Sequence, residues 1–117
     1  LGLPRPHLIL SWSDCPKEPD GGYNKALHML QDYEQALGCA PDLSSVFIVD
    51  DRMDNFVYHN PGNGIAIPAY KPDYSPVGLS KPDIALEQLR SWFDRPEVRS
   101  AADVRLLDKT NIFHQYV

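Results

Sequence analysis

The sequence has few of the features that mark disulfide-rich, membrane-spanning or nucleic-acid-binding proteins. Its 117 residues include two cysteines, Cys15 and Cys39, without C-x-x-C spacing, so neither a disulfide framework nor a zinc site is expected. No apolar run approaches the roughly 20 residues that span a bilayer, and the first residues show no signal-peptide pattern. Lysine and arginine do not cluster, and the formal net charge is -5. These absences predict a soluble single domain that binds no nucleic acid directly.

Motifs for several common catalytic sites are also missing. The four histidines lack the H-x-x-x-H and H-x-H spacings of metal sites. No serine lies in a G-x-S-x-G elbow, which argues against a serine hydrolase of that type. The glycine-bearing run at residues 60–64 lacks the Walker pattern, so it predicts a turn rather than a phosphate cradle. The strongest remaining candidates for a functional site are acidic residues.

The central feature of the chain is a short apolar run, residues 46–49, that ends in Asp50 and Asp51. β-branched and aromatic residues in so short a run predict a strand of a parallel sheet, covered on both faces. The carboxyl ends of such strands face the ligand crevice of an open α/β sheet, where two adjacent carboxylates require a partner. Magnesium suits such hard oxygen ligands. An Asp-Asp turn that caps the next helical segment, or the start of a receiver domain, is the alternative interpretation.

Strand and loop signals alternate with helical ones along the rest of the chain. Further strands are predicted at residues 7–12 and 65–67. Residues 13–22 and 69–78 are rich in proline and glycine, and they predict loops. The alternation predicts an α/β fold with a mainly parallel sheet.

Two segments have helical patterns. The first covers residues 25–37, with Asn24 as the N-cap and Gly38 as the terminator. The second starts at Ser80 and ends at Pro96, and it begins with a cap and a first-turn proline. The expected buried face of the second helix consists of Ala85, Leu86, Leu89, Trp92 and Phe93.

Four short motifs, taken in order, are similar to one family. They are GGYNK at residues 21–25, VFIVDD at 46–51, NPGNGIAIPAY at 60–70 and VRLLD at 104–108. This order resembles the later half of the haloacid-dehalogenase superfamily phosphatases of the NLI-interacting-factor type. That group includes the small phosphatases of the RNA polymerase C-terminal tail and the receptor subunit of the mitochondrial inner-membrane translocase. The resemblance implies one partial domain over residues 1–117, with its core over residues 7–108 and a tail over 109–117.

The resemblance also implies roles for three residues. In the family, an aspartate in a DxDx(T/V) motif attacks phosphorus, a lysine before a helix neutralises the phosphate, and an acidic pair after a later strand holds magnesium. Matched by motif, Lys25 is the lysine, and Asp50 and Asp51 are the acidic pair. Asp51 would ligate Mg²⁺ directly, while Asp50 would pair with Lys25 or reach the metal through water. A solvated lysine in the first turn of a helix is the alternative for Lys25.

The sequence has no DxDx(T/V) motif, so it lacks the nucleophile that this resemblance requires. In this fold the nucleophile strand lies beside the strand that ends in the acidic pair, and its absence would expose an apolar edge. We therefore expect another part of the same polypeptide, or another chain, to supply the missing N-terminal half of the domain. The apolar tail residues are expected either to contact a partner or to form a frayed terminus; they are Ile112, Phe113, Tyr116 and Val117.

Two functions follow from these expectations. The implied fold is an incomplete, mainly parallel three-layer α/β (Rossmann-like) sheet. With the nucleophile supplied, such a domain would hydrolyse a phosphomonoester, on a phosphoprotein, with Mg²⁺. Without it, the domain would be a catalytically silent binding or scaffold subunit of a larger assembly, as the translocase receptor implies. The resemblance leaves the compartment open between the mitochondrion and the nucleus.

Overall fold

The computed structural model describes residues 5–6, 8–15, 17–19, 25–57, 59–71, 74–80 and 83–114. It contains two strands, four α-helices and several short 3-10 helices (η) in this part of the chain. In chain order these are η1 (Trp12–Asp14), η2 (Leu27–Tyr33), α1 (Glu34–Leu37), η3 (Leu43–Ser45), β1 (Ile48–Asp50), η4 (Met53–Asn55), η5 (Pro61–Asn63), β2 (Gly64–Ala66), α2 (Pro76–Ser80), α3 (Ala85–Phe93), α4 (Pro96–Arg99) and η6 (Val104–Leu106). Within these ranges, no helix has the length and apolar character needed to cross a bilayer.

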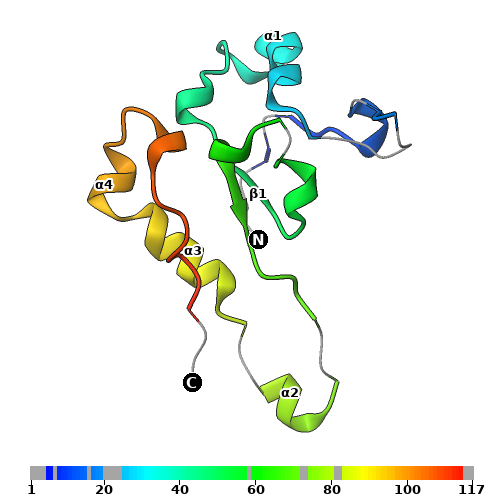
Figure 1. The fold of residues 1–117 in the computed structure, drawn as a ribbon. Coiled ribbons are helices and arrows are strands. Elements are labelled where there is room, and N and C mark those ends of the chain that lie inside the picture. Colours follow the sequence, from blue (N-terminus) through cyan, green and yellow to red (C-terminus); the bar gives the residue numbers. More distant parts are fainter. Residues whose placement is uncertain are drawn as a thin grey trace.

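β1 and β2 form a parallel pair, with α3 on one side of it (Figure 1). The register aligns Val49 with Ile65, and the Ile67 N–H donates to the Asp50 carbonyl oxygen at 3.0 Å. The predicted α/β class with parallel strands is therefore confirmed. The three-layer arrangement stays a prediction, because the described residues contribute two strands to the sheet.

Both strands are shifted from their predicted positions. β1 begins at Ile48 rather than at Val46, and β2 begins at Gly64. The side-chain amide of Asn63 donates to the carbonyl oxygens of Leu43 at 2.6 Å and Val46 at 2.9 Å. Because this side chain engages the Val46 carbonyl, strand pairing starts two residues later than the apolar pattern indicates.

The expectation that β1 is covered on both faces is wrong for Val49. This residue is 40% exposed, whereas its neighbour Ile65 in β2 is only 2% exposed. Register partners point to the same face of a sheet, so Val49 lies on the face that buries Ile65, but the core covers this face at β2 and leaves Val49 exposed in the described part of the chain. The apolar character of residues 46–49 thus exceeds the cover that the described residues give to β1.

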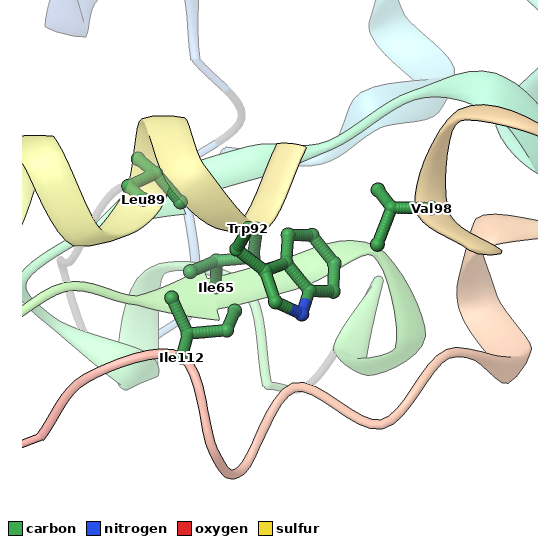
Figure 2. Close-up of a cluster of buried hydrophobic side chains, with 5 residues drawn as sticks. All are labelled: Ile65, Leu89, Trp92, Val98 and Ile112. Carbon is green, nitrogen blue, oxygen red and sulfur yellow. The ribbon is translucent and has the colours of Figure 1, made fainter. Parts of the chain in front are cut away.

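The core lies between β2, α3 and the C-terminal segment. Figure 2 shows Trp92 of α3 pointing toward Ile65 of β2 and Ile112, with Val98 of α4 beside its ring. The Phe47 ring meets the Trp92 ring edge to face, with centroids 5.6 Å apart. The predicted inner face of the second helix is confirmed except at Leu86, which is 69% exposed. Leu86 lies in the first turn of α3, where it lines a cleft beside β1 instead of the core.

The predicted helix starts and ends are partly correct. Gly38 ends α1 in the left-handed conformation, with φ of 77°, as predicted. The segment before it is a 3-10 helix followed by a single α turn, and Asn24 lies outside the described residues. The N-cap position of α3 is Ile84 rather than Ser80, and the carboxylate of the preceding Asp83 accepts from the Ala85 N–H at 3.0 Å. Pro96 occupies the first turn of α4 as well as following α3.

Two other predictions are wrong. Residues 8–11 form no strand, because the Asp14 carboxylate accepts from the Ser11 N–H at 2.8 Å and turns the chain into η1. His7 itself lies outside the described residues. The predicted loop at residues 69–78 contains the start of α2, where Pro76 has the fixed φ that suits the first position of a helix.

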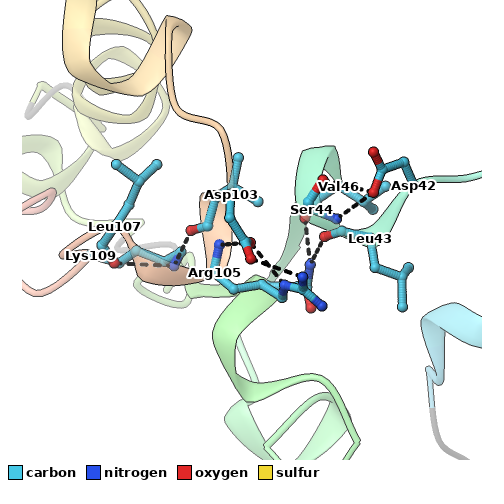
Figure 3. Close-up of polar contacts among 10 residues, drawn as sticks. Asp42, Leu43, Ser44, Val46, Asp103, Arg105, Leu107 and Lys109 are labelled. Atoms are coloured by element: carbon cyan, nitrogen blue, oxygen red, sulfur yellow. Dashed lines mark hydrogen bonds and ion pairs between the residues drawn. The ribbon is translucent and has the colours of Figure 1, made fainter.

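The C-terminal segment packs on its own chain. The Lys109 ammonium donates to the carbonyl oxygens of Val104 at 2.9 Å and Leu107 at 3.2 Å, which holds the end of η6 in place. Figure 3 shows Lys109 next to Leu107. Ile112 is then buried in the core, and Phe113 packs against it. The prediction that these two residues contact a partner is therefore corrected. The remaining tail residues, Tyr116 and Val117, lie outside the described residues.

Candidate functional site

The last residue of β1, Asp50, has a carboxylate that accepts several hydrogen bonds. Asp50 is 7% exposed, and donors reach both of its carboxylate oxygens. Its Oδ2 accepts from the Lys25 ammonium and from the Asn55 side-chain amide, the latter at 3.1 Å. Its Oδ1 accepts from the Arg52 backbone N–H at 2.9 Å. The buried position and these donors hold Asp50 in one orientation at the carboxyl end of the strand.

These contacts decide the charge of Asp50. Burial alone raises the pKa of a carboxyl group, because it disfavours the charged form. Here the hydrogen bonds from Lys25, the Arg52 amide and Asn55, together with the charge of Lys25, outweigh burial and hold the pKa of Asp50 below its usual value. Asp50 is therefore an ionised carboxylate at neutral pH.

Lys25 reaches Asp50 from the segment before η2. Its side chain is 51% exposed, so one side of the ammonium faces solvent. Its backbone N–H donates to the Asn55 carbonyl oxygen at 3.3 Å, and the next two residues, Ala26 and Leu27, are buried. The Asn60 side-chain oxygen accepts from the Leu27 N–H at 2.9 Å when the amide group is oriented so that both its oxygen and its nitrogen have hydrogen-bond partners. The turn after β1 thus anchors the segment that carries Lys25.

Asp51 lies beside the pair in a shared cleft. The cleft has a volume of about 420 Å³, and its lining includes Lys25, Asp50, Asp51, Tyr70 and Asp83. Asp51 is exposed there. Within the described part of the chain, no three histidine, cysteine or acidic side chains come together as metal ligands. Asp51 therefore offers one open carboxylate, next to one that is already engaged.

Lys25 also lines a second hollow. Its volume is about 520 Å³, and its lining is mainly apolar, with Leu10, Leu30 and Ile48 beside Lys25 and Asn55. Lys25 borders both spaces. Lys25 therefore contributes both to the cleft that contains Asp50 and Asp51 and to an apolar hollow next to β1.

This α/β fold, with Lys25, Asp50 and Asp51 around one cleft at the carboxyl end of a parallel strand, is consistent with a phosphatase-like domain of the haloacid-dehalogenase type. The chain belongs to the NLI interacting factor-like phosphatase family, whose model matches residues 6–105. The family resemblance given by the four motifs is thereby confirmed, while its restriction to the later half of the domain stays a prediction. No curated protein and no solved structure matches the chain.

The structure brings together two of the three residues that the motifs single out. Lys25 and Asp50 are in direct contact, although 25 residues separate them in sequence. Asp51 shares their cleft. The sequence pattern gave no indication of Asn55, and it included Asn60 only as the first residue of the motif at residues 60–70. Both lie in the turn after β1, where asparagine is common for local reasons, so its presence there carries no signal of a site.

Proposed function

We propose that this domain supplies the charge-neutralising and metal-binding part of a site that hydrolyses phosphomonoesters, on a phosphoprotein, once another segment supplies the nucleophile. The observation that carries the proposal is the contact between Lys25 and Asp50 at the carboxyl end of β1, in an open cleft. Membership of a phosphatase family supports it. Phosphoryl transfer needs mainly positioning and neutralisation of oxygen charge, and these residues are suited to both tasks.

Lys25 is the residue that we assign to the phosphate. Its ammonium has three donors, and Asp50 engages one side of it while the other side faces solvent. A phosphoryl group in the cleft would accept hydrogen bonds from the free side. Asp50, ionised and buried, would hold the ammonium in place during the reaction.

The residues present fit part of a magnesium site. Mg²⁺ is commonly held by one or two carboxylates together with waters and substrate phosphate. Asp51 is exposed in the cleft and fits as a direct ligand, whereas Asp50, with donors on both oxygens, fits a contact through water. The remaining protein ligand would come from the nucleophile segment. When bound, the ion would neutralise charge on the phosphoryl oxygens.

The nucleophile has to come from outside this sequence, which contains no DxDx(T/V) motif. Among the described residues, β1 pairs only with β2. Because the Asp50 carbonyl faces β2, the N–H and C=O of Val49 face the opposite edge. Ile48 borders the apolar hollow at this strand. We propose that the missing half places a strand along this edge, which would cover it and bring the nucleophile next to Asp51.

One observation favours a second function. The missing motif is also what a domain without catalysis would show, and such a domain would serve as a binding or scaffold subunit of a larger, mitochondrial assembly. Lys25 and Asp50 would then remain as a structural ion pair. The two functions differ in whether the complete assembly turns over a phosphomonoester.

The test uses the native assembly purified through this chain, with p-nitrophenyl phosphate as the probe. Magnesium-dependent turnover is expected, and Asp51→Asn or Lys25→Met should abolish it. Lys17→Met, which changes an exposed lysine outside the cleft, is the matched control and should leave turnover unchanged. Absence of turnover in the complete assembly would overturn hydrolysis and favour the scaffold.

A further inference from the structure

We propose that Asn55 is the positioning residue of the Lys25 and Asp50 pair, because one asparagine holds both partners, the aspartate through its side chain and the lysine through its main chain. This inference stands on contacts within the chain and holds whether or not the domain takes part in hydrolysis.

The side chain of Asn55 acts on the carboxylate. Its amide nitrogen donates at 3.1 Å to Oδ2 of Asp50, the oxygen that also accepts from Lys25. A neutral donor at this oxygen leaves the charge of the ion pair unchanged, but it limits rotation of the carboxylate about its last bond. The ammonium then meets an acceptor at a fixed place.

The main chain of Asn55 acts on the lysine. Its carbonyl oxygen accepts from the Lys25 N–H at 3.3 Å. The Lys25 side chain is half exposed, so packing constrains its long stem only in part. This backbone hydrogen bond fixes the point at which the Lys25 side chain starts relative to Asp50. The same residue therefore sets the positions of both ends of the ion pair.

The turn that carries Asn55 completes this arrangement. The Asn55 N–H donates to the Arg52 carbonyl oxygen at 3.2 Å, which closes η4. The Arg52 N–H in turn donates to Oδ1 of Asp50 at 2.9 Å. Each oxygen of the Asp50 carboxylate therefore receives one donor from this single turn. Buried Ala26 and Leu27 anchor the start of η2 independently, so loss of the Asn55 side chain should leave the backbone in place.

The test is the side-chain ¹H–¹⁵N NMR spectrum of lysine ammonium groups in the full chain. An ammonium held in a fixed ion pair exchanges its protons with water slowly enough to give a cross peak. We expect such a peak for Lys25, assigned by its loss in Lys25→Arg. Asn55→Ala and Asn55→Leu both remove the donor and keep the main-chain carbonyl, and Asn55→Leu nearly preserves the volume. In each of these two variants, the Lys25 peak should broaden or vanish, while the backbone amide spectrum should remain that of a folded protein.

Asn111→Ala, at an exposed asparagine, is the matched control and should leave the Lys25 peak unchanged. A Lys25 peak that persists unchanged in either folded Asn55 variant would overturn the proposal, since a purely structural role predicts that result. A second measurement needs no variant. In the unmodified protein, the Asn55 side-chain amide protons should show nuclear Overhauser contacts to the Lys25 Hε protons, and their absence would also overturn it.

Discussion

The ring of Phe56 packs directly on the backbone of Gly64, the first residue of β2, and leaves no space for a Cβ atom there. Phe56 is buried, and it follows the turn that holds Asp50 and Lys25. This contact fixes the turn after β1 against the neighbouring strand. The geometry of the site thus depends on a glycine that has no chemical role in it.

Replacement of Gly64 by alanine should therefore destabilise the fold. We expect Gly64→Ala to lower the free energy of unfolding by about 1–3 kcal/mol, because the added methyl group forces the Phe56 ring to move. Urea unfolding followed by circular dichroism measures this change. In the double variant with Phe56→Leu, the cost of the alanine should shrink, which a double-mutant cycle detects. Equal costs in both backgrounds would contradict the contact.

Truncation of a core residue of α3 and of an exposed residue of α3 should change the free energy of unfolding by very different amounts. Trp92 is 3% exposed, and Trp92→Ala should cost about 3–5 kcal/mol of unfolding free energy. Leu86 lies outside the core, and Leu86→Ala should change it by no more than about 0.5 kcal/mol. Denaturant unfolding of the two variants makes the comparison. A large loss for Leu86→Ala would restore the sequence-based prediction that this residue is buried.

Asn63 should stabilise the segment that leads into β1. Its amide satisfies the carbonyl oxygens of Leu43 and Val46, and Asn63→Ala would leave both without this donor. We expect a loss of about 1–3 kcal/mol in unfolding free energy. Thermal unfolding of Asn63→Ala measures the loss, with Asn111→Ala, at an exposed position, as the control. Equal melting temperatures for the two variants would rule out this role.

The stability of the fold should depend on pH through the ionisation of Asp50. The pKa of Asp50 in the folded state lies below the unfolded value of about 3.9, so its ionised form stabilises the fold. That contribution is present above the unfolded pKa and is lost as pH falls through the folded pKa. Wild type should therefore be more stable than Asp50→Asn at neutral pH, and the difference should shrink below about pH 4. A difference that is constant with pH would contradict this assignment.

Local sequence signals predicted those parts of the fold that depend on local chemistry. Gly38 ends its helix because its φ of 77° suits glycine. Apolar residues three and four positions apart identified α3 and its inner residue Trp92. The pattern failed where a side chain formed a hydrogen bond with the backbone. The Asp14 carboxylate turns the chain at Ser11, where apolar residues predicted a strand, and Asn63 engages the Val46 carbonyl.

The site was predictable where motif and strand position coincide. Asp50 and Asp51 follow a short apolar run, and the spacing of the motifs selected Lys25. Asn55 could not be predicted, because its role depends on a turn that folds back to the strand end and to Lys25 at once. Such a contact has no sequence period and no characteristic residue spacing.

We propose that a segment carrying the nucleophile lies along the edge of β1 that has no partner strand among the described residues. The most direct measurement is photocrosslinking from p-benzoylphenylalanine at Val49, in the native setting, with the adduct sequenced by mass spectrometry. Leu106, which is 85% exposed and lies in η6, is the control position. We predict that the Val49 adduct contains a DxDx(T/V) sequence, from the same polypeptide or another chain, and that the Leu106 adduct does not. A Val49 adduct without this motif, or no adduct where Leu106 gives one, would contradict the account.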